Sequence, residues 1–218
     1  MMGLQLIVFA KAPEPGKAKT RLIPALGVDG AAHLAAQLLQ QTLDTARDAA
    51  AALGQTMRSP VHLHVCGSPH PEHRTWSGIK LPQPCHCSAQ IEGDLGARMA
   101  HAFTQALVGG NDALLFGTDG VGLDCQRIVQ AAEALAQHDA VLQPVQDGGY
   151  LLLGLRATAL GQHTALFEAM PWSTDQVAAL TLARLGRLGC TTRVLPALRD
   201  IDTPEDLAHR PKKSPAGP

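Results

Sequence analysis

Short apolar runs alternate along the chain with longer stretches of helical periodicity. Leu4–Ala10 (LQLIVFA) is an almost continuous apolar run, typical of a strand that is covered on both faces of a parallel sheet. Similar short runs predict further strands at Val61–Val65, Ala113–Phe116, Ala140–Gln143, Tyr150–Leu155 and Thr191–Leu195. The pattern therefore predicts a buried strand near the start of the chain and several further strands along it.

Longer amphipathic stretches between these runs predict helices. They cover about Asp29–Leu53, Leu95–Val108, Cys125–Gln137 and Ser173–Leu188. Asp29 is the predicted N-cap of the first helix, with Gly54 as its stop, and Ser173 with Gln176 forms a capping-box pattern. Thr203 followed by Pro204 predicts a short closing helix.

Strands that alternate with helices predict an α/β fold, here a single Rossmann-like domain whose mostly parallel sheet is flanked by helices. No internal repeat or linker divides the sequence, so the domain is expected to cover residues 1–209. The stretch Ser68–Pro84 contains four prolines and is expected to be a loop. Residues 210–218 are rich in Lys, Pro and Gly and are expected to form a flexible tail.

Composition excludes several classes of protein. The 218 residues are 45% apolar and 17% charged, which excludes a disordered or fibrous chain. A formal net charge of −1 and only 3% aromatic residues argue against a nucleic-acid partner. Apolar runs are short and no signal-peptide pattern opens the chain, so we expect no membrane partner and a cytoplasmic location. Five irregularly spaced cysteines are typical of reduced thiols.

The segment that follows the first strand, Phe9–Leu22 (FAKAPEPGKAKTRL), is strongly basic. In open α/β sheets, ligands bind beyond the carboxyl ends of the strands, which is where this loop lies. Gly16 would let the backbone come close to a ligand, and the loop carries four cations: Lys11, Lys17, Lys19 and Arg21. Cations in such a loop favour a diphosphate or triphosphate ligand, and a solvated basic turn is the alternative. Neither a Walker loop nor a GxGxxG motif is present.

Acidic residues follow other strands. Asp119 lies three residues after the end of the run Ala113–Phe116 and is expected to face the same crevice as the basic loop. Mg²⁺ prefers one or two carboxylates together with phosphate oxygens, so Asp119 is a candidate metal ligand. Near the C-terminus, either Asp200 or Asp202 is expected to supply the second carboxylate, with Asp202 preferred. Turn or cap roles are the alternative for each of these residues.

Two further turns are candidate parts of the site. Asp147 and Gly148 precede a predicted strand, where they either form an ordinary turn or line the acceptor side of the crevice. Asp94 is the predicted N-cap of the helix Leu95–Val108. Arg98, one turn into that helix, either contacts the nucleotide or pairs with a carboxylate.

Histidines and cysteines form a less convincing pattern. His62, His64 and Cys66 alternate on one predicted strand, and Cys85-His86-Cys87 follows. Structural zinc sites usually carry CxxC or HxxxH spacing, so half-buried strand residues are the preferred interpretation. No GxSxG motif and no Ser-His-Asp arrangement indicates a hydrolase.

Six ordered blocks carry a family resemblance. They resemble the blocks of the rSAM/selenodomain-associated transferase 1 family, within the nucleotide-diphospho-sugar transferase (GT-A) superfamily. In chain order the blocks are FAKAPEPGKAKTRL, GDLGARM, GTDGVGL, DGGYLLLGL, PWST and DIDTPEDL. The match runs from about Leu4 to Leu207. Its AKTRL and DIDTPEDL parts are also similar to those of 2-phospholactate and molybdenum-cofactor guanylyltransferases.

The resemblance implies a GT-A fold, a nucleotide donor and Mg²⁺ or Mn²⁺. It places the metal carboxylates at Asp119 and Asp202. Two departures stand out. The chain has Gly120 and Val121 where the family reads Cys-Pro, and Gln146 where the family has an acidic residue.

We therefore expect a metal-dependent transferase that binds a nucleotide and a small-molecule acceptor. Lys17, Arg21 and Asp119 are the predicted catalytic residues. The predicted nucleotide-site residues are Lys11, Gly16, Lys19, Asp94, Arg98, Asp147 and Gly148. Nucleotidyl transfer from an NTP to a phosphorylated or otherwise nucleophilic acceptor is preferred, because four cations in the first loop favour a triphosphate, whereas a leaving diphosphate already carries its metal. Such chemistry needs positioning and charge neutralisation rather than a covalent residue. A glycosyltransferase that uses a nucleotide sugar and an inactive nucleotide-binding protein are the alternatives.

Overall fold

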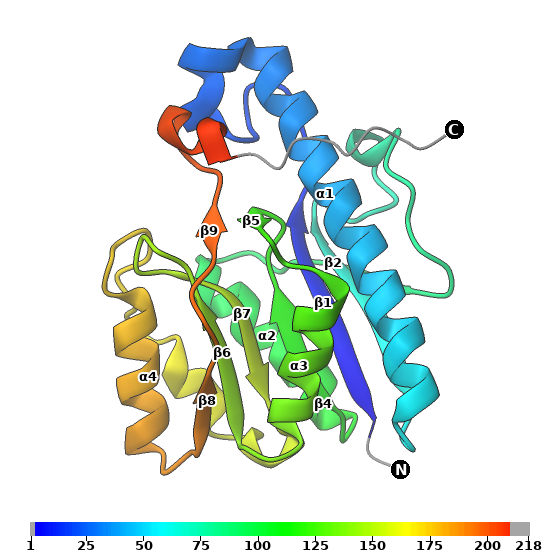
Figure 1. The fold of residues 1–218 in the computed structure, drawn as a ribbon, viewed down its shortest axis with the longest axis vertical. Coiled ribbons are helices and arrows are strands. Elements are labelled where there is room, and N and C mark those ends of the chain that lie inside the picture. The colour runs from blue at the N-terminus through cyan, green and yellow to red at the C-terminus, as the bar shows by residue number, and fades with distance from the viewer. Residues whose placement is uncertain (1–2, 210–218) are drawn as a thin grey trace.

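The computed structural model describes residues 3–209, and a seven-stranded sheet forms its centre (Figure 1). The strand order is β3-β2-β1-β4-β7-β6-β8. The strands are β1 (Leu4–Lys11), β2 (Val61–Ser68), β3 (His86–Ala89), β4 (Asp112–Phe116), β6 (Ala140–Pro144), β7 (Tyr150–Leu155) and β8 (Thr192–Val194). Strand β7 pairs antiparallel with both of its neighbours, and all other pairs in this sheet are parallel. The predicted fold class is confirmed.

Helices cover both faces of the sheet. They are α1 (Ile23–Thr56), α2 (Leu95–Val108), α3 (Cys125–Leu135) and α4 (Val177–Arg187). Helices α1 and α3 contribute to one apolar core, and α2 and α4 contribute to the other. Short 3₁₀ helices lie at Thr20–Leu22, Arg74–Trp76, Ala157–Ala159, His163–Leu166 and Pro204–His209.

The alternation of side chains along the strands explains the continuous apolar runs. In β1, Leu6 and Val8 point into the core under α1 and α3, while Ile7 points into the core under α2. Strand β4 divides in the same way, with Phe116 on the first face and Leu115 on the second. Since each buried aliphatic or aromatic side chain stabilises the fold by about 1.5–3 kcal/mol, a strand that is apolar at every position is stabilised from both sides.

Three predicted helices differ from the structure in their ends or caps. Helix α1 begins at Ile23 rather than at an Asp29 cap, kinks at Gly27 (φ 71°, ψ 170°), and continues through Gly54 to Thr56. Ser173 forms no capping box, because its backbone is left-handed (φ 64°) and α4 starts only at Val177. Helix α3 ends at Leu135, two residues before the predicted end. The closing segment, Pro204–His209, is a 3₁₀ helix.

Helix α1, with the turn before it, is also long and apolar enough, by length and composition alone, to span a membrane. The span is Thr20–Thr56, with mean hydropathy 1.3 in its most apolar window. In the fold, however, the apolar stripe of α1 is part of the protein core: Leu39, Leu43 and Ala46 are buried against the sheet beside Ile128 of α3. An amphipathic core helix therefore accounts for this apolar composition.

Three strands have no counterpart in the predicted elements. Strand β3 lies at the edge of the sheet beside β2 and follows the proline-rich loop. A separate two-stranded sheet pairs β5 (Gly120–Val121) with β9 (Arg199–Asp200). In Figure 1, β9 lies above β6 and β7, next to β5. This small sheet brings the C-terminal acidic segment to the loop that follows β4. The predicted tail, residues 210–218, lies outside the described residues.

Candidate functional site

A two-lobed crevice lies beyond the carboxyl ends of β1 and β4. The first lobe, called the basic lobe, has a volume of about 570 Å³. Its wall contains Lys11, Lys17, Lys19, Arg21, Arg98, Asp119 and Asp202. Its neighbour, called the acidic lobe, has a volume of about 540 Å³. That wall contains Met99, Asp147, Tyr150, Trp172, Asp175 and Asp200.

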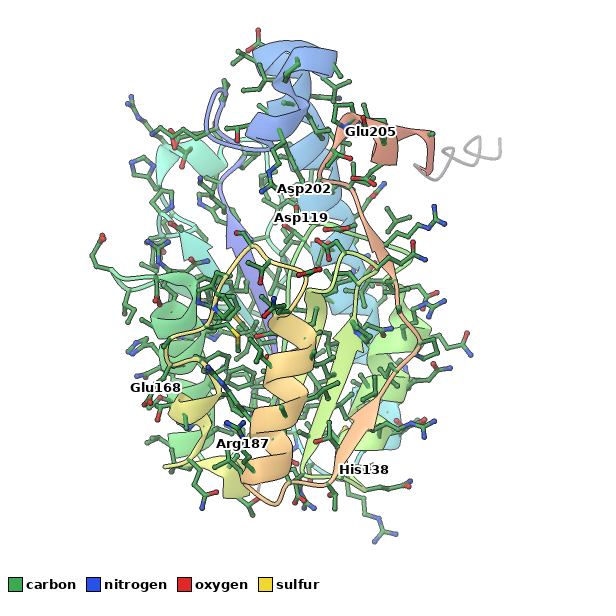
Figure 2. The ribbon with its side chains drawn as sticks, turned by 90° about the vertical axis from the view of Figure 1, so that its left-hand side faces the viewer. Asp119, His138, Glu168, Arg187, Asp202 and Glu205 are labelled. Carbon is green, nitrogen blue, oxygen red and sulfur yellow. The ribbon has the colours of Figure 1, made fainter. Side chains whose placement is uncertain are left out.

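The lobes meet at a shared wall. The residues that line both lobes are Phe9, Arg21, Leu95, Gly117, Asp119 and Asp202. Figure 2 shows Asp119 and Asp202 close together at the upper part of the molecule, one from the loop after β4 and the other from the segment after β9. The predicted meeting of the basic loop with these two carboxylates is therefore present in the structure.

Lys19 is the cation that pairs with both carboxylates of the shared wall. Its Nζ lies 2.9 Å from Asp119 Oδ1 and 3.6 Å from Asp202 Oδ1, and it donates a hydrogen bond of 2.5 Å to the carbonyl of Ile201. The Lys19 side chain is only 4% exposed, whereas the carboxylates of Asp119 and Asp202 are 55% and 37% exposed. Two half-exposed carboxylates thus converge on one buried positive charge.

Other residues of the basic loop are arranged more openly. Arg21 pairs with Asp202 through a 2.7 Å contact between Nη1 and Oδ2. Lys17 pairs with Glu14 at 3.2 Å and its side chain is 65% exposed. Lys11 Nζ donates to the carbonyl of Lys17, and Arg98 Nε donates to the carbonyl of Gly93. All four loop cations and Arg98 line the basic lobe, as predicted, but Lys17, Lys19 and Arg21 are already paired with carboxylates.

The acidic lobe holds carboxylates without cationic partners. Within residues 3–209, Asp147, Asp175 and Asp200 form no ion pair. Burial raises the pKa of Asp200, and the negative charges of the neighbouring Asp147 and Asp202 raise it further. The positive charge of Lys19 opposes this shift. Burial also raises the pKa of the Tyr150 phenol, which therefore stays protonated at neutral pH.

Three predicted site residues do not line the crevice. Asp94 caps α2 by accepting a 2.8 Å hydrogen bond from the backbone N–H of Ala97, so it has a structural role. Gly16, with φ 77°, shapes the loop but lines neither lobe. The Gly148 amide donates to the carbonyl of Val145 and is not available to a ligand. Asp147, by contrast, lines the acidic lobe, as predicted.

Gly148 is needed for packing. Its φ is 89°, and a Cβ at this position would lie 2.0 Å from the carbonyl oxygen of Asp175. We expect Gly148→Ala to lower the free energy of unfolding by about 2–4 kcal/mol, measured by urea denaturation, because backbone strain and a backbone clash add together. Gly161→Ala is the matched control, since Gly161 has the same φ of 89° and nothing within 4 Å of its Cβ position. Equal losses in both variants would contradict the clash.

The departures from the family pattern lie away from the ligand-facing walls. Gln146 is exposed and lines neither lobe, so its missing carboxylate removes no contact from the crevice. Gly120 and Val121 form β5. A Cβ on Gly120 would lie 2.0 Å from Leu151 Cδ2, which makes glycine the residue that fits this backbone beside Leu151.

Several lining residues were missed by sequence reasoning. Gln90 lines the basic lobe while its amide donates to the carbonyls of Ala10 and Cys66. Tyr150, Trp172 and Asp175 line the acidic lobe. Two of these residues lie in blocks that carry the family resemblance: Trp172 in PWST and Tyr150 in DGGYLLLGL. The buried indole N–H of Trp172 has no hydrogen-bond partner within the described chain.

The histidines and cysteines of β2 and β3 form no metal site. His64 is buried, its ring centroid lies 4.8 Å from that of His86, and its Nε2 lies 2.7 Å from Ser88 Oγ. Burial and His86 lower the pKa of His64 to about 4, so its imidazole is neutral at pH 7. All five cysteines are free. Over residues 3–209, no group of three or more His, Cys, Asp or Glu side chains is arranged to hold a metal ion.

The chain is similar to known proteins in both sequence and fold. The family model described as "Uncharacterized protein conserved in bacteria (DUF2064)" matches residues 55–174. A crystal structure from Desulfovibrio desulfuricans G20, named as a candidate nucleotide-diphospho-sugar transferase, shares 30% sequence identity with a TM-score of 0.81. That match covers 99% of this chain and 90% of the other. None of the curated proteins compared with the chain matches it significantly.

More distant structures share the fold. A CMP:2-keto-3-deoxy-manno-octonic acid synthetase complexed with CTP is 12% identical with a TM-score of 0.55, and the match covers 95% of this chain and 96% of that one. Rv0371c from Mycobacterium tuberculosis H37Rv, in complex with manganese, is 16% identical with a TM-score of 0.55. The match covers 95% of this chain and 97% of the Rv0371c chain.

Proposed function

The chain belongs to the DUF2064 family, and we propose that it is a metal-dependent nucleotide-binding transferase that moves a nucleotidyl group from an NTP to a small acceptor. The comparisons support a nucleotide-binding transferase in general, since structures of this fold include a synthetase with bound CTP and a candidate nucleotide-diphospho-sugar transferase. The observation that carries the finer proposal is the junction of the two lobes at Asp119, Lys19 and Asp202.

The basic lobe suits the donor phosphates. Lys11 and Lys17 can contact the outer phosphates as point charges, and Arg21 can bind two oxygens at once. The half-exposed carboxylates of Asp119 and Asp202 already converge on one cation, Lys19, and fit the pattern of one or two carboxylates with which Mg²⁺ binds substrate phosphates. Asp119 and Asp202 would hold Mg²⁺ or Mn²⁺, which when bound neutralises charge on the donor phosphates.

The acceptor would enter from the acidic lobe. A deprotonated acceptor oxygen forms a bond to the α-phosphorus of the NTP, the bond from that phosphorus to the bridging oxygen breaks, and pyrophosphate leaves with the electron pair. Residues of the basic lobe hold the departing charge, while the acidic-lobe wall orients the acceptor at the shared boundary. This chemistry depends on positioning and charge stabilisation, so no covalent residue is required.

Glycosyl transfer from a nucleotide sugar is the second candidate, and one observation favours it. Lys19 and Arg21 are paired with Asp119 and Asp202, so fewer cations are free than the loop sequence indicates. A smaller free positive charge fits a leaving diphosphate. The inactive-protein alternative loses part of its motivation, because Gln146 lies outside both lobes.

Binding affinities separate the two donor types. We expect an NTP to bind about ten- to a hundredfold more tightly than the matching NDP, because one γ-phosphate held by a lysine or arginine contributes roughly 1.5–3 kcal/mol. Calorimetric titration of each NTP, its NDP and nucleotide sugars at fixed Mg²⁺ measures this preference. A preference below a few-fold, combined with tight binding of a nucleotide sugar, would replace nucleotidyl transfer by glycosyl transfer.

Two narrower statements remain predictions. Membership of the rSAM/selenodomain-associated subfamily rests on the sequence blocks, and the cytoplasmic location rests on composition and cysteine usage.

A further inference from the structure

The acidic lobe has a charge imbalance that specifies the chemistry of its ligand. We propose that this lobe binds an acceptor bearing a positively charged amine and excludes phosphorylated acceptors. The inference rests on the proposed function, in which this lobe receives the acceptor, and it narrows the acceptor to one chemical class.

Three carboxylates of the lobe lack a counter-ion. Asp147 accepts a 3.0 Å hydrogen bond from the backbone N–H of Gly149, but it has no cationic partner. Asp175 and Asp200 also form no ion pair among residues 3–209. Arg21 is the cation that lines the acidic lobe. It lies at the boundary with the basic lobe, and its charge is already paired with Asp202. The wall of the acidic lobe therefore carries a net negative charge, with Asp147 and Asp175 exposed and Asp200 half-buried, and the wall of the basic lobe beside it carries a net positive charge.

The metal ion proposed for Asp119 and Asp202 would lie at the shared boundary of the two lobes, and no second metal ion accounts for the charges of Asp147, Asp175 and Asp200. Across the described part of the chain, no three carboxylate, imidazole or thiol groups are placed so that they could share a metal. The carboxylates are instead distributed around a cavity of about 540 Å³, which is large enough for a small organic molecule. A charged organic group that reaches several of them is the ligand that fits.

The charge pattern discriminates among acceptors. A phosphate group in the lobe would lie near several like charges, which weakens its binding, whereas an ammonium gains an attractive interaction with each carboxylate. An uncharged acceptor would desolvate the carboxylates without supplying a counter-charge. Tyr150 and Trp172 also line the lobe, and aromatic rings attract cations through their faces.

Three sugars that share one ring test the class of acceptor: glucosamine, glucose and glucose 6-phosphate. Each is titrated by calorimetry into the full chain at about pH 6.5, below the usual pKa of an amino group. We expect glucosamine to bind about five- to tenfold more tightly than glucose, and about a hundredfold more tightly than glucose 6-phosphate. Equal or weaker binding of glucosamine than of glucose, a preference for the phosphate, or no binding of any probe would overturn the proposal.

Charge-removing variants test whether the acidic lobe causes the preference. Asp147→Asn and Asp175→Asn keep the side-chain size, and asparagine can still accept the Gly149 hydrogen bond. Each variant should reduce the glucosamine-to-glucose affinity ratio by about two- to fivefold. Glu168→Gln removes an exposed carboxylate that lines neither lobe and that Figure 2 shows at the left side of the molecule, well below Asp119 and Asp202, and it should leave the ratio unchanged. An unaltered ratio in both Asp variants also overturns the proposal.

The donor titration is run on the same protein sample. If no nucleotide binds with Mg²⁺ while glucosamine still binds as expected, the proposed function fails and the charge preference of the lobe stands. If a nucleotide binds and the sugar series shows no amine preference, only the acceptor class fails. The sugar series is therefore measured both with and without the best-binding nucleotide.

Discussion

Replacing Asp119 with asparagine is expected to lower turnover by about a hundred- to a thousandfold, because removal of one group that stabilises transition-state charge has effects of this size. Asparagine has nearly the same size as aspartate but no charge to offer a divalent ion. Lys19 keeps its contacts with Asp202 and the Ile201 carbonyl, so the fold should lose only about 1 kcal/mol and the melting temperature about 2–4 °C.

Release of pyrophosphate with the best-binding NTP, Mg²⁺ and a supporting acceptor measures this loss, and nucleotide affinity with and without Mg²⁺ provides a second readout. Asp124→Asn is the matched control. Asp124 caps α3 by accepting a 2.9 Å hydrogen bond from the Arg127 N–H, lines neither lobe, and should leave turnover within about twofold. Asp119 is not a metal ligand if its asparagine variant keeps turnover and the Mg²⁺ dependence of nucleotide binding.

Substituting Lys19 by methionine is expected to have the largest combined effect. Methionine fills much of the same volume, but the buried ammonium that holds Asp119 and Asp202 together is lost, and two carboxylates then repel each other. Loss of one partner of a buried ion pair costs about 3–5 kcal/mol, and because both carboxylates are half-exposed we expect about 2–3 kcal/mol here. Nucleotide affinity should also fall by about ten- to a hundredfold.

Urea denaturation and nucleotide titration measure the two effects separately. The double variant Lys19→Met with Asp119→Asn should recover part of the lost stability, since the repulsion between Asp119 and Asp202 is removed. Lys17→Met is the control, because Lys17 is 65% exposed and pairs only with Glu14, so its loss should change stability by less than about 0.5 kcal/mol. A double variant no more stable than Lys19→Met would show that Lys19 acts through packing and not through this pair.

The sequence by itself determined six of the seven strands of the central sheet and the positively charged half of the site. Apolar runs such as Leu4–Ala10 predict strands because a strand covered on both faces is apolar at nearly every position, and this pattern is local. The basic loop and Asp119 could be placed for a similar reason: a loop that directly follows a strand of a parallel sheet lies at its carboxyl edge. Both inferences need only the order of residues along the chain.

Only the tertiary structure decided which charges are paired and which are free. The hydrogen bond from Lys19 to Ile201 joins residues 182 positions apart, and that from Arg21 to Asp202 joins residues 181 apart. Such contacts depend on how β9 packs beside β5, and neither two-residue strand has a periodicity that a sequence could display. Asp175, from the turn before α4, joins the acidic lobe for the same reason, because a side chain's partners are set by the packing of distant elements and not by its neighbours in sequence.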